Sequence, residues 1–160
     1  MDYKIEDLDI SKRLDELGLA LPDSLTFFPE NFNTANAKGD FVFADSMLDL
    51  TKIFLQDNSI SIPAFGQDTE LYVSRRSADI YLPAIFFGLS QITENSTIVS
   101  VSLNVLSNYI YDLYKGTSGK KTAHVDLYIE TKEKGKVKKI SYNGSVEGLK
   151  ELPKIIKAMK

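Results

Sequence analysis

The sequence contains no cysteine, and His124 is its single histidine. Without cysteine the chain has no disulfide framework, no thiolate zinc site and no cysteine nucleophile, and a cytosolic location fits that absence. Its most apolar run, 80–89, covers only about half of a bilayer's hydrocarbon core at ~1.5 Å per residue. The first ten residues lack the basic start and apolar core of a signal peptide. We therefore expect a cytoplasmic protein with no membrane segment.

The composition is that of an ordinary globular protein. The 160 residues are 43% hydrophobic and 26% charged, which is unlike a disordered chain. This length favours one domain that spans 1–160. A division into two sub-lobes, 1–76 and 77–160, stays open.

The two parts of the chain carry opposite net charge. Residues 1–114 hold 7 Lys and Arg against 17 Asp and Glu, a balance of −10. Residues 115–160 hold 12 lysines against 5 Asp and Glu, a balance of +7. Such a division is typical of a basic surface for an acidic partner, of chain ends that attract each other, or of a solvated hairpin that uses lysine.

The first half of the chain predicts short elements of both kinds. A serine start and a glycine stop delimit a short helix, and two aromatic segments flank a polar loop as in a hairpin. A polar stripe of period 3.6 predicts a second helix, and an apolar segment predicts a third with Pro83 near its first turn. In chain order, these are a helix at 11–18, a hairpin across 25–43, a helix at 45–58, short strands in 60–66 and 70–76, and a helix at 79–92.

The second half predicts a helix, a β-hairpin and a further helix. Residues 96–115 carry a narrow polar stripe on a broad apolar face, which indicates a central helix. Residues 122–130 alternate cleanly and pair with the returning strand that ends at Tyr142. Ser145 caps the last helix, and Pro153 should kink it. We expect an α+β fold, an antiparallel sheet with a C-terminal helix–β-hairpin–helix unit packed around the apolar central helix.

The stretch "GTSGKKT" at 116–122 is similar to a phosphate-binding loop but does not fit one. Its glycines are two residues too close together. It also follows a predicted helix and precedes a predicted strand, so no helix N-terminus meets the phosphates. We interpret it as a helix end followed by a lysine-rich connector.

Two small clusters could carry chemistry. His124 and Asp126 share one face of a predicted strand, where the carboxylate could orient the imidazole for acid–base work. A metal site would need at least two further good ligands, and we expect none. Arg75 and Arg76 precede a predicted helix start and could hold an anion, or they could simply reach solvent.

Two surfaces could bind macromolecules. Small polar side chains on the central helix could form the contact with another protein or with a second copy of this chain. Lysines interleaved with tyrosines on the hairpin could bind nucleic acid. The first surface comprises Ser100, Asn104, Ser107 and Asn108, and the second Lys132, Lys134, Lys136, Lys138 and Lys139.

The segment from about Ile98 to Met159 is similar to a known class of protein. The order "NYIYDLYKG", "HVDLYIE", "KKISYNGS" and "VEGLKELPKII" resembles the small effector-associated constant-component proteins of bacterial conflict and phage-defence operons. The resemblance implies a non-enzymatic adaptor and identifies no site residue.

We therefore expect a non-catalytic protein-interaction module, an accessory or adaptor subunit of a bacterial complex, acting in phage defence if the resemblance holds. The lone histidine and the lack of any catalytic constellation favour this hypothesis. A nucleic-acid-binding module that uses the lysine hairpin is one alternative. An enzyme with acid–base chemistry at His124 and Asp126 is another. No cofactor is expected.

Overall fold

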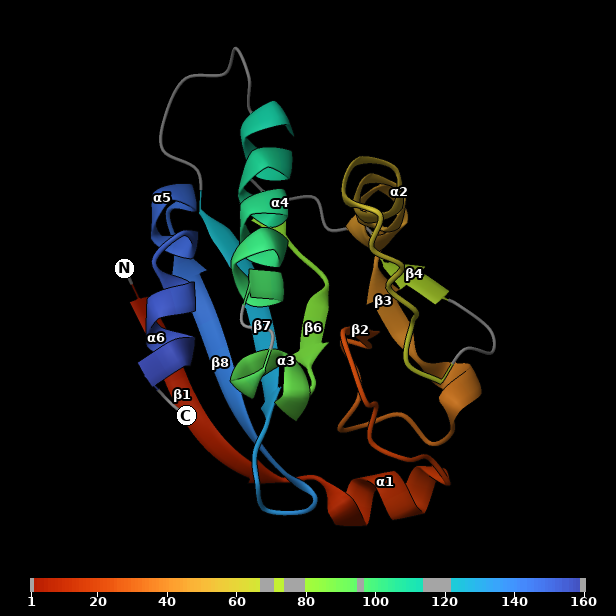
Figure 1. The fold of residues 1–160 in the computed structure, drawn as a ribbon. Helices are drawn as coiled ribbons and strands as arrows, with labels where there is room; N and C mark the ends of the chain where they lie inside the picture. The colour runs from red at the N-terminus through yellow and green to blue at the C-terminus, as the bar shows by residue number, and fades with distance from the viewer. Residues whose placement is uncertain (1, 67–70, 74–79, 95–96, 114–121, 159–160) are drawn as a thin grey trace.

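A mixed β-sheet with helices packed against one face forms the body of the computed structural model (Figure 1). The structure describes residues 2–66, 71–73, 80–94, 97–113 and 122–158. The strands are β1 (Asp2–Asp9), β2 (Thr26–Phe28), β3 (Val42–Ala44), β4 (Leu71–Val73), β5 (Ile80–Tyr81), β6 (Ala84–Phe87), β7 (Ala123–Glu130) and β8 (Lys136–Gly144). The helices are α1 (Ser11–Leu17), α2 (Ser46–Asn58), α3 (Leu89–Thr93), α4 (Thr97–Leu113), α5 (Val146–Leu149) and α6 (Leu152–Ala158), with a 3₁₀ turn at Lys38–Asp40.

The main sheet has the order β1-β8-β7-β6-β2, and β5 pairs with β7 beside β6. The pairs β1–β8, β7–β8 and β2–β6 are antiparallel, whereas β5 and β6 run parallel to β7. The α+β class is therefore confirmed, but the sheet is mixed rather than antiparallel throughout. Strands β3 and β4 form a separate parallel pair. Since β1 pairs with β8 and β2 with β6, backbone pairing joins the segments 1–76 and 77–160.

Helix α4 is the central helix, as its narrow polar stripe predicts. It contacts α2, α3, α5 and α6, and Figure 1 shows it in front of β7 and β6. Leu103, Leu106 and Ile110 of α4 are fully buried in the same core as Leu127 of β7. The β7–β8 hairpin is also confirmed. Ser145 Oγ accepts a hydrogen bond from the amide of Gly148 at 3.3 Å, as expected of a helix cap.

The predicted helix at 79–92 is wrong, because its described part holds two strands and is helical only at its end. Strands β5 and β6 lie on either side of Pro83, and only α3 is helical. All four residues of β6 are buried. A strand next to a parallel partner and covered on both faces is uniformly apolar, so its sequence has no alternation to distinguish it from a buried helix.

The predicted hairpin across 25–43 is also wrong. Its first segment, β2, pairs with β6, and its second, β3, pairs with β4. The loop between them is closed by one backbone hydrogen bond, from the amide of Glu30 to the carbonyl of Val42 at 2.7 Å, and by the side chain of Asn31, without a strand ladder. Asn31 Oδ1 accepts from the amide of Val42 at 2.8 Å, and Asn31 Nδ2 donates to the carbonyl of Asp40 at 2.9 Å. The backbone donors and acceptors of β2 are therefore not used by β3, and they pair with β6 instead.

The last helix is divided rather than kinked. Helix α5 ends at Leu149 and α6 begins at Leu152, one residue before Pro153. Proline has no amide hydrogen to donate to the carbonyl four residues earlier, and its ring crowds that turn. The two short helices together bury Leu149, Leu152 and Ile156. The helix is therefore interrupted close to Pro153, as the sequence predicted, but by a break and not by a kink.

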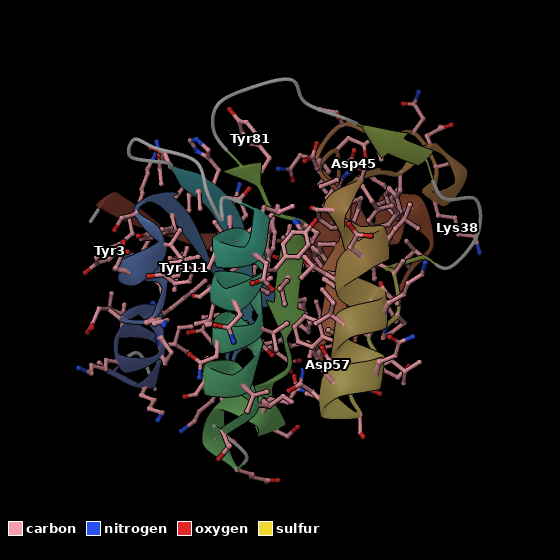
Figure 2. The ribbon with its side chains drawn as sticks, turned by 90° about the horizontal axis from the view of Figure 1, so that it is seen from above. Tyr3, Lys38, Asp45, Asp57, Tyr81 and Tyr111 are labelled. Carbon is pink, nitrogen blue, oxygen red and sulfur yellow. The ribbon has the colours of Figure 1, made fainter. Side chains whose placement is uncertain are left out.

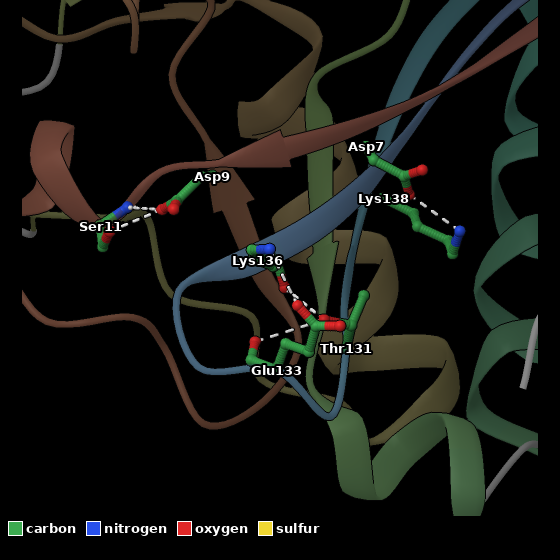
Figure 3. Close-up of polar contacts among 7 residues, drawn as sticks. All are labelled: Asp7, Asp9, Ser11, Thr131, Glu133, Lys136 and Lys138. Atoms are coloured by element: carbon green, nitrogen blue, oxygen red, sulfur yellow. Dashed lines mark hydrogen bonds and ion pairs between the residues drawn. The ribbon is translucent and has the colours of Figure 1, made fainter.

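Opposite charges meet where the first strand lies beside the hairpin. The register places Asp7 opposite Lys138 and Asp9 opposite Lys136. Asp7 Oδ1 and Lys138 Nζ are 2.8 Å apart (Figure 3). Lys136 Nζ also lies 2.9 Å from Glu133 Oε2. The acidic first part of the chain and its basic end thus attract each other within one molecule, which accounts for part of the charge asymmetry.

Candidate functional site

A groove between α2 and α4 collects the exposed members of the polar stripe. We call it the helix groove; its volume is about 670 Å³. Asn104 and Asn108 are exposed on α4, and Asp57 is exposed on α2. Figure 2 shows Asp57 at the side of α2 that faces α4. The groove is lined by Ile53, Asp57, Asn58, Val101, Asn104, Val105, Asn108, Tyr109, Tyr111 and Asp112.

Two tyrosines of α4 tie this helix to its neighbours. The Tyr109 hydroxyl donates to Asp49 Oδ2 of α2 at 3.2 Å, and the Tyr111 hydroxyl donates to Glu147 Oε1 of α5 at 2.9 Å. Lys150 Nζ lies 5.3 Å from the centre of the Tyr111 ring. Each tyrosine therefore holds a carboxylate of a neighbouring helix beside α4, although neither of these carboxylates lines the groove itself.

The other two stripe residues do not line the helix groove. Ser107 is fully buried, and its hydroxyl donates to the carbonyl of Leu103 at 2.9 Å. Such a bond back to the preceding turn satisfies a serine hydroxyl inside a helix. Ser100 is partly exposed but lies outside the groove. The structure thus brings Asn104 and Asn108 together and separates them from the two serines.

The contact between Tyr109 and Asp49 should make the stability of the protein depend on pH in the alkaline range. Burial, followed by the charge of Asp49, raises the pKa of Tyr109 to about 12. An unfolded tyrosine titrates near pH ~10. Since the folded pKa is the higher one, this contribution to stability is complete below pH ~10 and is lost as the pH rises toward 12.

We expect the free energy of unfolding of the wild type to fall more steeply between about pH 10 and pH 12 than that of Tyr109→Phe. Urea unfolding at a series of alkaline pH values, followed by circular dichroism, measures both slopes. Equal slopes for the two proteins would show that Tyr109 titrates normally in the folded state.

A second, smaller pocket lies on the face of the sheet that the helices leave open. We call it the sheet pocket; its volume is about 340 Å³. His124 and Asp126 of β7 line it together with Lys139 and Ser141 of β8. Strand alternation points these four residues to one face, because Asp126 pairs with Ser141 across the hairpin. Tyr81 of β5 and Glu30 from the loop after β2 complete its wall.

The sheet pocket combines charge with aromatic rings. Lys139 Nζ is 3.9 Å from Asp126 Oδ2 and 5.7 Å from the centre of the Tyr128 ring. The rings of Tyr81 and His124 are stacked, with centroids 4.5 Å apart. Burial, and then the charge of Asp126, raises the pKa of Tyr128 well above its usual range. The arrangement can hold a small polar molecule, and it places His124 and Asp126 on one wall.

The hairpin lysines do not form one surface. Lys138 and Lys139 are adjacent in β8 and therefore point to opposite faces of the sheet. Lys136, Lys138 and Lys139 each lie within 4.0 Å of a carboxylate. Lys132 and Lys134 are exposed in the turn between β7 and β8. The lysines that could contact phosphates are thus divided and partly neutralised.

Arg75 and Arg76 lie outside the described residues. In the part of the chain that is described, no group of three or more acidic or histidine side chains could hold a metal ion. No described helix is long and apolar enough to cross a membrane.

No protein-family model, no curated protein and no solved structure was found to match this chain. The resemblance of 98–159 to constant-component proteins therefore stays a prediction.

Proposed function

We propose that this protein is a non-catalytic interaction module whose helix groove docks a basic segment of a partner protein. The observation that carries the proposal is the lining of the groove. It combines an apolar floor, formed by Ile53, Val101 and Val105, with exposed amides and carboxylates on its walls. Among the described residues that line it there is no lysine or arginine. A lysine- or arginine-bearing segment would therefore meet the carboxylates of Asp57 and Asp112 and no like charge in the groove lining.

The side-chain amides of Asn104 and Asn108 could fix the position of a bound segment along the groove. Asn104 and Asn108 are four residues apart on α4 and so lie on the same face, one helical turn from each other. Each amide can both donate and accept a hydrogen bond, which fixes a bound segment along the groove. Asp57 and Asp112 supply the charge on opposite walls.

The length of the groove sets the size of the partner segment. Its α4 wall runs from Val101 to Asp112, which is about 16 Å at ~1.5 Å per residue. This length accommodates about three turns of a helix laid against α4. An adaptor that recognises one short basic helix in this way needs no catalytic group.

The test is charge reversal in the groove, compared with the same charge change elsewhere. Asp57→Lys with Asp112→Lys should abolish capture of a discrete protein from nuclease-treated extract of the native host. The wild type and the control variant should retain it. The control is Asp15→Lys with Asp23→Lys, which alters exposed residues outside the groove.

The captured protein is then purified and titrated against all three forms. We expect at least about tenfold weaker binding for the groove variant, and binding to the wild type that weakens as salt is added. The segment protected in the complex should be basic. Equal affinity for the groove and control variants would contradict the proposal, and so would capture that nuclease abolishes.

A further inference from the structure

Strand β1 leaves a long edge of the main sheet open. Its eight residues, Asp2–Asp9, pair in unbroken register with β8. Within the part of the chain that the structure describes, β8 is its sole strand neighbour. Figure 1 shows β1 as the outermost strand on this side. An edge of this length carries a row of backbone donors and acceptors that another strand can pair with.

The edge also exposes apolar side chains. Tyr3 is 43% exposed and Ile5 is 40% exposed, and both belong to the small group of large apolar residues at the surface. They pair with Tyr142 and Ile140 of β8, so they share the face of the sheet that carries the helices. A neighbouring strand on the far side of β1 would cover both of them.

The acidity of β1 is largely balanced within the molecule, so it does not by itself repel a second acidic strand. Asp7 is paired with Lys138, as described above, and Asp9 lies opposite Lys136 in the strand register and accepts two hydrogen bonds from Ser11 (Figure 3). Lys4 Nζ and Glu6 Oε1 lie 3.1 Å apart on the other face of the strand. Lys4 and Glu6 therefore remain as an exposed pair of opposite charge in the middle of the edge.

We infer that two copies of this chain form a symmetric dimer by pairing their β1 strands antiparallel about Ile5. A two-fold axis between antiparallel strands stands perpendicular to the sheet, so residues on the same face must oppose each other. Centred on Ile5, this pairing places Lys4 of each copy opposite Glu6 of the other. It also places the two Ile5 side chains together, with both Tyr3 rings diagonal to them.

Charge selects this register over its neighbours. If the two-fold axis moves by one residue toward the N-terminus, it passes through Lys4 and puts Lys4 opposite Lys4 of the second copy. If the axis moves by one residue toward the C-terminus, it passes through Glu6 and puts Glu6 opposite Glu6 of the second copy. Like charges directly opposite each other destabilise a strand pair, whereas opposite charges stabilise it. The dimer therefore has a continuous sheet across both copies, with the helices of both on the same side.

The first test uses the absence of cysteine from the sequence. In the inferred register, Ile5→Cys brings two thiols together at the axis, within the reach of a disulfide. Mild oxidation should convert most of this variant to a covalent dimer. Tyr3→Cys is the matched control, because it places its two thiols four residues out of register; it should stay largely uncrosslinked. Efficient crosslinking of Tyr3→Cys together with failure of Ile5→Cys would overturn the inferred register.

The second test exchanges the charges, on full-length protein with any tag at the C-terminal end. Sedimentation of the wild type at about 100 µM should give a dimer. Lys4→Glu and Glu6→Lys should each weaken dimerisation about tenfold or more, and the double exchange should restore it. Because the double variant keeps both charged groups, its recovery excludes misfolding as the cause of the loss. A wild type that sediments as a monomer would overturn the inference, as would a double variant no better than the single ones.

Discussion

Replacing Phe28 with alanine should lower the free energy of unfolding by about 4 kcal/mol, one of the two largest effects that we expect of a single substitution. Phe28 is fully buried in β2. Its ring contacts those of Phe32, Phe65, Phe86 and Tyr128, with centroids 4.8–5.3 Å apart. Alanine would leave a cavity at the centre of these four rings, and it would also remove the favourable geometry of the ring pairs.

The measurement is urea unfolding of the wild type, Phe28→Ala and Phe28→Leu. A domain of ordinary stability has about 5–15 kcal/mol in total, so Phe28→Ala should unfold at a much lower urea concentration. Phe28→Leu retains most of the buried volume and should lose less than half as much. A loss below about 2 kcal/mol in the alanine variant would mean that the surrounding rings close the cavity.

The contacts of Phe28 illustrate what the sequence could not predict. Its neighbours come from the loop after β2, from the segment before β4, and from β6 and β7. No spacing in the chain indicates that these segments meet. The pattern around Phe28 predicted a local hairpin, because two short aromatic strands flanked a loop of turn-forming residues. The long-range pairing of β2 with β6 prevailed, since it buries both strands completely.

Elements with a clear period were predicted well. Helix α4 has a narrow polar stripe and β7 alternates, and both patterns arise because one face is buried and the other is not. Strand β6 is buried on both faces, so its residues give no period at all. The sequence therefore predicts elements with one buried face better than elements that are buried on both faces.

The same distinction applies to the candidate site. Asn104 and Asn108 could be found because they repeat on one helix face. Asp57 could not, because nothing in the sequence places α2 beside α4. The spacing of Ser107 places it in the predicted contact surface, but its hydroxyl donates a hydrogen bond to the carbonyl of Leu103 within the helix. For the sheet pocket, alternation identified His124 and Asp126, but the approach of Lys139 depends on the register of β7 and β8.

Replacing Gly88 with alanine should destabilise the protein by about 3 kcal/mol or more, for a steric reason. Gly88 links β6 to α3, and its φ of −72° is one that any residue adopts. A Cβ atom at this position would lie 2.2 Å from the carbonyl oxygen of Asp23 and 2.8 Å from its carbonyl carbon. Both are backbone atoms, so no side-chain rotation relieves the clash. Alanine can be accommodated only if the chain that leads into β2 moves away from the end of β6.

Gly39→Ala is the matched control for this experiment. A Cβ atom at Gly39 would meet nothing within 4 Å, and its φ is not in the left-handed region. Since alanine restricts the unfolded chain more than glycine does, this variant should be neutral or up to about 1 kcal/mol more stable. Urea unfolding of both variants against the wild type measures the contrast. If Gly88→Ala were as stable as Gly39→Ala, the close packing of 23–24 against the end of β6 would be disproved. The pairing of β2 with β6, which brings these two segments together, would then be in doubt as well.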